Sequence, residues 1–137
     1  TGSSATSAIS QGGARNSASV TQSGTGANSS IQQDNGTGSS DDDNSATVTQ
    51  NGDSDSFITQ VNDSASATVD QVGDRHLSNI VQSGDFDTAE IDQTGENNNS
   101  GVTQTGDVNT ALVGQSGVGN NSGVLQSSGL NRAIVNQ

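Results

Sequence analysis

The stretch Q-T-G-D-V-N-T-A-L-V-G-Q at residues 104–115 shows the pattern on which the whole chain is built. Within it, Asn109, Ala111 and Val113 stand at every second position before the final glutamine, and Gly106 precedes them. Alternation with a period of two is typical of a β-strand that turns one face inward. Glycine tolerates the backbone angles of a tight turn. The stretch therefore predicts a turn followed by a strand.

The closing glutamine of this stretch recurs along the chain. Twelve glutamines follow a short β-prone run, and nine of the eleven gaps between them are 11 residues long, while the other two are 17 and 10. They are Gln11, Gln22, Gln33, Gln50, Gln60, Gln71, Gln82, Gln93, Gln104, Gln115, Gln126 and Gln137. Spacing as regular as this is a sign of a repeat architecture rather than of a disordered low-complexity chain.

The positions before each glutamine are equally regular. A β-branched aliphatic residue stands two positions before it in all twelve copies, and serine and alanine alternate strictly four positions before it. The true repeat is therefore two units, about 22 residues, in six copies. We expect the aliphatic residues to form the core: Ile9, Val20, Ile31, Val48, Ile58, Val69, Ile80, Ile91, Val102, Val113, Val124 and Val135. Asparagine is favoured six positions before the glutamine, and we expect it to form a second ladder: Asn16, Asn44, Asn98, Asn109, Asn120 and Asn131.

These patterns predict an all-β fold, a β-solenoid in which each repeat forms one rung of strand, turn and strand. Odd and even strands would form two parallel sheets that face each other, with identical residues stacked from rung to rung. Six rungs at a spacing of about 4.8 Å make a rod about 29 Å long. We expect a single domain over residues 1–137, with rungs at about 1–22, 23–50 with an insertion at 34–43, 51–71, 72–93, 94–115 and 116–137.

Composition excludes several classes of protein. Only 26% of the 137 residues are hydrophobic and 1% are aromatic, which is too little for a conventional globular core. No stretch approaches the roughly 20 apolar residues that a membrane span needs, and a net charge of −12 argues against binding nucleic acid. The absence of cysteine rules out disulfides and cysteine zinc sites. We find no nucleophile with a base and an orienting group, and predict neither an enzyme nor a cofactor.

The two ends of the repeat array are expected to be uncapped. The first unit begins near the N-terminus and the last ends on its repeat glutamine, whereas soluble solenoids usually carry capping segments. An uncapped rung offers free backbone groups to another chain, and a head-to-tail contact that does not close produces a filament. The predicted polymer interface joins Ile9, Gln11, Val20 and Gln22 at one end to Val124, Gln126, Val135 and Gln137 at the other.

The string Gln-x-Gly-x-x-Asn-x-Ala-x-x-x-Gln resembles the curlin repeat of bacterial curli subunits. It is complete at residues 11–22 and 104–115, and occurs at 126–137 with Ser128 in place of glycine. In the first copy the matching residues are Gln11, Gly13, Asn16, Ala18 and Gln22. The resemblance covers essentially the whole chain, although the tyrosines common in the family are missing.

The resemblance implies a secreted subunit of a functional amyloid fibre in a biofilm matrix, where it would also support adhesion. Members of the family are exported unfolded through the outer membrane of Gram-negative bacteria and polymerise outside the cell, started by a nucleating minor subunit. The implied partners are therefore further copies of the chain, a nucleator and secretion machinery. The regular repeats favour a major subunit, and a minor nucleating subunit remains an alternative.

Two further alternatives remain open. One is a soluble β-solenoid binding module of the adhesin or ice-binding type. Ice binding would need a flat array of outward threonine pairs, of which only Thr47 and Thr49 form one on a repeat strand. A disordered acidic matrix polymer would agree with the composition but not with the serine and alanine alternation.

Several single features admit a chemical and a simpler structural interpretation. Asp41–Asp43, with Asp34, either hold Ca²⁺ or form a solvated loop, and the spacing lacks an EF-hand pattern. Asp70 and Asp92 are expected one above the other on the outside, where they would slow aggregation, share a cation or simply be solvated. His76, the sole histidine, cannot form a metal or catalytic site alone. Outward apolar residues are candidates for lateral bundling or surface attachment: Phe57, Leu77, Val81, Phe86, Leu112, Leu125 and Ile134.

Overall fold

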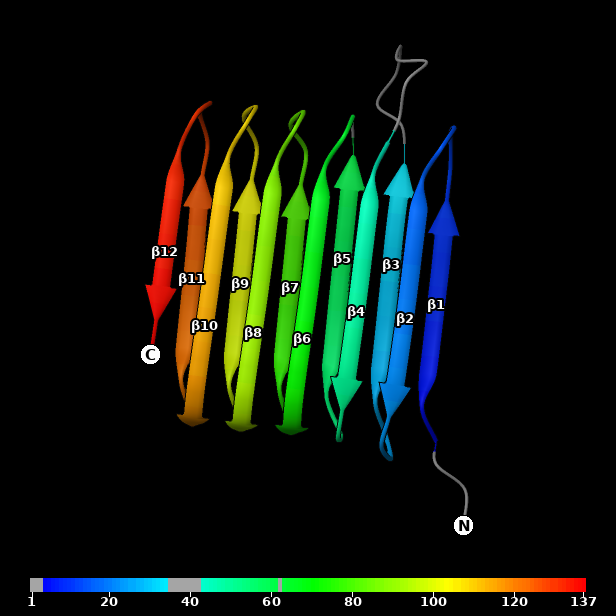
Figure 1. Ribbon diagram of the computed structural model, residues 1–137, viewed down its shortest axis with the longest axis vertical. Coiled ribbons are helices and arrows are strands. Elements are labelled where there is room, and N and C mark those ends of the chain that lie inside the picture. Colours follow the sequence, from blue (N-terminus) through cyan, green and yellow to red (C-terminus); the bar gives the residue numbers. More distant parts are fainter. Residues whose placement is uncertain (1–3, 35–42, 62) are drawn as a thin grey trace.

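The computed structural model describes residues 4–34, 43–61 and 63–137, and it shows strands and turns without a helix in these ranges. Twelve β-strands follow one another, and each rung contributes one strand to each of two sheets (Figure 1). Their bounds are β1 Thr6–Gln11, β2 Ser17–Ser23, β3 Asn28–Asp34, β4 Ser45–Asn51, β5 Asp55–Val61, β6 Ser66–Asp74, β7 Leu77–Gln82, β8 Thr88–Glu96, β9 Asn99–Gln104, β10 Thr110–Val118, β11 Asn121–Gln126 and β12 Arg132–Asn136.

The strands are arranged as the predicted β-solenoid. One six-stranded sheet has the order β1-β3-β5-β7-β9-β11 and the other β12-β10-β8-β6-β4-β2, with parallel pairing in both. The first and last rungs therefore lie at opposite ends of the stack, as Figure 1 shows. This confirms an all-β fold with two parallel sheets and a rung of about 22 residues.

The register stacks each repeat position on its own kind. Val113 pairs with Val135, and Gln115 pairs with Gln93. The change in repeat length is absorbed in the turns: Ser17 pairs with Ser45, 28 residues on, whereas Ser45 pairs with Ser66, 21 residues on. A one-residue slip would turn every core side chain outward, which explains why length variation is confined to the turns.

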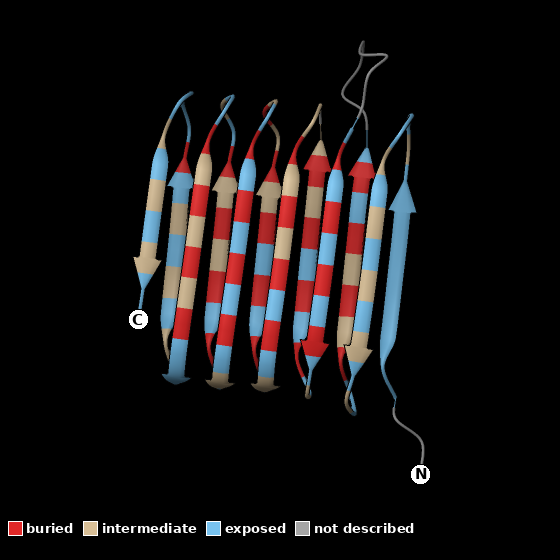
Figure 2. Cartoon of the chain, in the orientation of Figure 1, coloured by how far each residue is buried: buried red, intermediate tan, exposed pale blue. Residues whose placement is uncertain are grey.

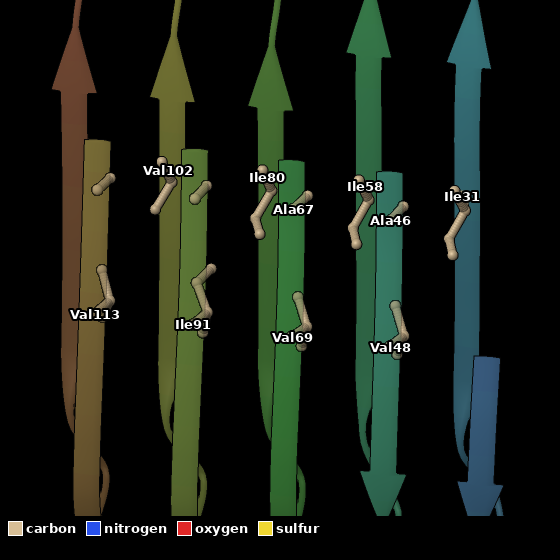
Figure 3. Packing of buried hydrophobic residues seen from close by; sticks show 12 residues of the cluster. Ile31, Ala46, Val48, Ile58, Ala67, Val69, Ile80, Ile91, Val102 and Val113 are labelled. Atoms are coloured by element: carbon tan, nitrogen blue, oxygen red, sulfur yellow. The ribbon is translucent and has the colours of Figure 1, made fainter. Parts of the chain in front are cut away.

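The core is a thin layer between the two sheets. Burial alternates residue by residue along the central strands (Figure 2). Aliphatic side chains from facing strands meet there (Figure 3), and eight of the twelve expected core residues are buried: Ile31, Val48, Ile58, Val69, Ile80, Ile91, Val102 and Val113. Alanines of the even sheet complete the layer: Ala46, Ala67, Ala89 and Ala111.

The remaining four expected core residues belong to the first and last rungs. Val20, Val124 and Val135 are partly buried and pack against the core. Ile9 is 46% exposed, so it does not belong to the buried core of a single chain, contrary to expectation. The reason is its place in β1, which has a neighbouring strand on one side only.

The repeat glycines serve two purposes rather than the one expected. Gly73 and Gly95 adopt left-handed backbone angles, with φ of 115° and 110°. Gly84 does not, but a Cβ atom placed on it would lie 2.3 Å from the carbonyl oxygen of Gly106. Glycine is thus required in some turns by the backbone angle and in others by the close approach of the next rung.

A second left-handed position lies four residues after the glutamine and often carries a side chain. It includes Phe86, Val108 and Leu130, with φ of 58°, 60° and 62°. The N–H of Val108 donates to the carbonyl oxygen of Asp85 at 2.8 Å, and that of Leu130 to Asp107 at 3.0 Å. These hydrogen bonds join neighbouring rungs at the corner and hold a conformation that these side chains disfavour.

Candidate functional site

The repeat glutamines form two continuous columns of hydrogen bonds, one in each sheet. In each column the Nε2 atom of one glutamine donates to the Oε1 atom of the glutamine in the next rung, at distances between 2.7 and 2.9 Å. The odd column is Gln11, Gln33, Gln60, Gln82, Gln104 and Gln126. The even column is Gln22, Gln50, Gln71, Gln93, Gln115 and Gln137.

The second amide hydrogen of these glutamines links the two sheets. Gln82 donates to the backbone carbonyl of Ser66 at 3.0 Å, and Gln71 donates to that of Asp55 at 3.1 Å. Because the amide nitrogen must face this carbonyl, the orientation of the amide group is set by its surroundings. Each column therefore has a direction, with donors pointing from the first rung toward the last.

The direction makes the two ends of the stack chemically different. Gln11 and Gln22 donate to the second rung, but within the described residues no donor reaches their Oε1 atoms. Gln126 and Gln137 accept from the fifth rung and donate to the carbonyl oxygens of Thr110 and Asn121, which leaves each with one N–H without a partner in the described chain. One end presents acceptors and the other presents donors.

The asparagine positions form shorter ladders at the corners. The Oδ1 atom of Asn98 accepts the backbone N–H of Asn120 at 3.0 Å, while its Nδ2 atom donates to the carbonyl oxygen of Thr94 at 3.0 Å. Asn109 and Asn131 are related in the same way, with an N–H to Oδ1 distance of 3.1 Å. The side chain thus joins one rung to the next and closes its own turn. Asn16, Asn44 and Asn120 occupy equivalent places in their rungs.

The repeat pattern puts His76 at an asparagine position, and in the structure it takes the place of an asparagine in this ladder. It is 2% exposed; its Nδ1 atom accepts the N–H of Asn98 at 3.3 Å, and its Nε2 atom lies 3.1 Å from the carbonyl oxygen of Val72. These contacts fit an imidazole with its hydrogen on Nε2. The signal in the sequence was the place of His76 at an asparagine position.

Asp87 fills another of these places and is completely buried. Its Oδ1 atom accepts the N–H of Asn109 at 2.9 Å, whereas its Oδ2 atom has no hydrogen-bond partner. Burial raises the pKa of this carboxyl group, the hydrogen bonds from Asn109 and Gly84 oppose the rise, and the charge of Asp107 adds to it.

Acidic residues are confined to the middle of the chain. All fifteen lie between Asp34 and Asp107, so neither the first nor the last rung contains one. Asp70 and Asp92 stack in register, and burial, Glu90 and Asp70 raise the pKa of Asp92. The end rungs can therefore approach another copy without bringing carboxylates together.

The other predicted features can be placed only in part. Asp41 and Asp42 lie outside the described residues, while Asp43 forms an exposed ion pair with Arg15 at 3.0 Å. The part of the chain that the structure describes holds no group of three or more acidic, histidine or cysteine residues suited to a metal ion. In the same part, no helix has the length and apolar character to cross a membrane.

Comparison with known proteins points to one family. Residues 77–106 and 87–117 match the family model of the curlin associated repeat, in two overlapping copies. Over residues 77–117 the match confirms the resemblance to the curlin repeat that the string Gln-x-Gly-x-x-Asn-x-Ala-x-x-x-Gln suggested. No curated protein and no solved structure matches the chain significantly.

Proposed function

We propose that this chain, which carries curlin associated repeats, is a structural subunit that polymerises head to tail into an extracellular curli-type fibre. The observation that carries the proposal is the pair of glutamine columns. Among the described residues, these columns end on unpaired acceptors in the first rung and unpaired donors in the last. An amide group left without a partner in a dry contact is costly, and a second copy supplies the missing partner.

The register of the solenoid defines the contact between copies. Stacking β11 and β12 on β1 and β2 of the next copy continues the spacing of the rungs. The Nε2 atom of Gln126 then donates to Oε1 of Gln11, and Gln137 donates to Gln22. Val124 covers Ile9, whose 46% exposure in the single chain would fall. The opposite arrangement, first rung on first rung, would bring acceptor against acceptor.

The distribution of charge supports the same contact. Carboxylates directly above one another at about 4.8 Å repel, and stacking two end rungs creates no such pair because neither contains an acid. The fibre would thus consist of junctions without acidic side chains between acidic central segments. Lateral contacts between these segments are disfavoured, since each segment has a strongly negative net charge.

The curlin repeat also supports the cellular setting of this function. We propose secretion by a Gram-negative bacterium, growth of the fibre at the cell surface from a nucleating minor subunit, and a role in biofilm matrix and adhesion. Ice binding would need threonines on successive rungs. The column that contains Thr49 continues with Asp70 rather than with a third threonine, which argues against this alternative.

The proposed function is tested by incubating the purified chain without agitation and examining it by electron microscopy and fibre diffraction. We expect filaments with a meridional repeat near 4.8 Å, whose fragments seed fresh protein. A chain that folds into strands yet stays monomeric, even after seeds of any filament are offered, would contradict the proposal.

A further inference from the structure

In the ladder of asparagine positions at the corners, Asp87 is the side chain that, when ionised, cannot donate a hydrogen bond as the asparagines do. Asn109 and Asn131 use their amide nitrogens to donate to the carbonyl oxygens of Gly106 and Ser128, three residues earlier in the same turn. At the corresponding corner the residue three positions before Asp87 is Gly84, whose backbone hydrogen-bonds to the Asp87 carboxyl group. An ionised carboxylate carries no hydrogen to donate. Its Oδ2 atom is buried without a partner.

A proton on Asp87 would restore the missing donor. The protonated carboxyl group has one O–H donor and keeps an acceptor, which is the hydrogen-bonding capacity of an asparagine amide at this corner. The Oδ1 atom would still accept the N–H of Asn109 at 2.9 Å. Protonation also removes the cost of holding a charge out of water in a residue that is 0% exposed.

The charged groups around Asp87 offer no compensation. The turns of neighbouring rungs place Asp63, Asp85 and Asp107 in one column, in which Oδ1 of Asp85 accepts the N–H of Asp63 and Oδ1 of Asp107 accepts that of Asp85. The two ion pairs in the described residues lie elsewhere, between Arg15 and Asp43 and between Arg75 and Glu96.

We propose that Asp87 takes up a proton when the solenoid folds, so that mild acid favours the folded chain. The inference concerns the folding of each chain, and only its extension to fibre growth depends on the proposed function. The folded pKa of Asp87 is raised above 3.8. Its stabilising contribution is therefore present in acid and is lost as the pH rises through the folded pKa.

The test replaces Asp87 by asparagine in the full chain. The background carries His76→Asn and Asp92→Asn, because His76 is a second buried titratable side chain of the corner ladder and Asp92 also has a raised pKa. Asp107→Asn is the matched control, because it removes the same charge from an exposed residue of the neighbouring column that Asp63, Asp85 and Asp107 form. Circular dichroism follows the denaturant midpoint from about pH 4 to 7, and infrared spectroscopy follows the carbonyl band of protonated carboxyl groups.

We expect the background protein to lose stability as the pH rises, and Asp87→Asn to flatten this slope more than Asp107→Asn does. Asp87→Asn should also remove an infrared band of the folded protein and raise the folding equilibrium constant at pH 7 roughly tenfold. Equal slopes for the two variants, or an unchanged infrared band, would overturn the inference. Because both measurements report on folding, they can succeed even if no filament forms at any pH, which would count against the proposed function alone.

Discussion

A buried glutamine is the smallest unit that joins all parts of this fold. Gln82 donates to Gln104 at 2.9 Å and to the carbonyl oxygen of Ser66 at 3.0 Å, and it accepts from Gln60 at 2.9 Å. One side chain thus connects three rungs and both sheets. Because only 26% of the chain is hydrophobic, hydrogen bonds between buried polar side chains supply much of the stability that a hydrophobic core gives other proteins.

Replacing this glutamine by an apolar side chain of similar size tests its contribution. We expect Gln82→Met to lower the free energy of unfolding by about 3 kcal/mol, since the amide hydrogen of Gln60, the Oε1 atom of Gln104 and the Ser66 carbonyl lose a partner. Denaturant unfolding gives the value. Asn79→Met, on the exposed face of the same strand, is the control and should change stability little. A small effect at both positions would show that the glutamine columns contribute little to the stability of the fold.

Backbone strain at the corners leads to a prediction in the opposite direction. Val108 is 46% exposed and has a φ of 60°, a conformation that disfavours β-branched residues. We expect Val108→Gly to raise the free energy of unfolding by about 0.5–1 kcal/mol, because relief of strain exceeds the added flexibility of the unfolded chain. Val72→Gly, in the exposed part of β6, should destabilise instead. Loss of stability in both variants would show that the corner is not strained.

At the scale of the strand, the odd and even sheets differ in one column. The odd strands carry serine and the even strands alanine, in register throughout. The hydroxyl groups of this column lack a hydrogen-bond partner in five strands: Ser29, Ser56, Ser78, Ser100 and Ser122. Nothing in the contacts of these residues explains why serine stands there.

Because these hydroxyl groups are unpaired, we predict that replacing one of the serines by alanine stabilises the fold. We expect Ser78→Ala to raise the free energy of unfolding by about 1 kcal/mol, because it removes a buried polar group that makes no hydrogen bond. Ala89→Ser, in the other sheet, should lower it. Denaturant midpoints of the two variants decide, and a Ser78→Ala protein less stable than the parent would point to a hydrogen bond with buried water.

The strands and their register were accessible from the sequence, because side chains alternate with a period of two and identical positions recur every 22 residues. The left-handed corner position was not accessible. The residues there include Arg75, Phe86, Val108 and Leu130, and none of these residue types signals a left-handed backbone. Hydrogen bonds between rungs impose the conformation. The importance of Asp87 was also hidden, since only the structure shows that the corner is buried.

At the scale of the whole molecule, the stack has two unlike ends. Its direction follows from how each amide is held against the opposite sheet, a property that the spacing of glutamines cannot reveal. The absence of acids from both end rungs was visible in the sequence, but it gains meaning only when these rungs are seen at the open ends. Together these features predict growth of one end onto the other, and not of like ends onto each other.

The most direct test of this account is seeded growth with one end damaged. Val135→Asp places a carboxylate on the inward face of β12, and Ile134→Asp, the matched control, places one on the outward face of the same strand. A Val135→Asp chain keeps its first rung, so it should bind the last rung of a seed and then block further growth.

We therefore predict that Val135→Asp fails to elongate seeds and, at a small fraction of the wild-type concentration, stops wild-type growth at the seed end that presents the last rung, while Ile134→Asp elongates. Circular dichroism of both variants establishes that the remaining rungs fold. Elongation by Val135→Asp at the wild-type rate, or equal loss of growth in both variants, would contradict head-to-tail stacking through the end rungs.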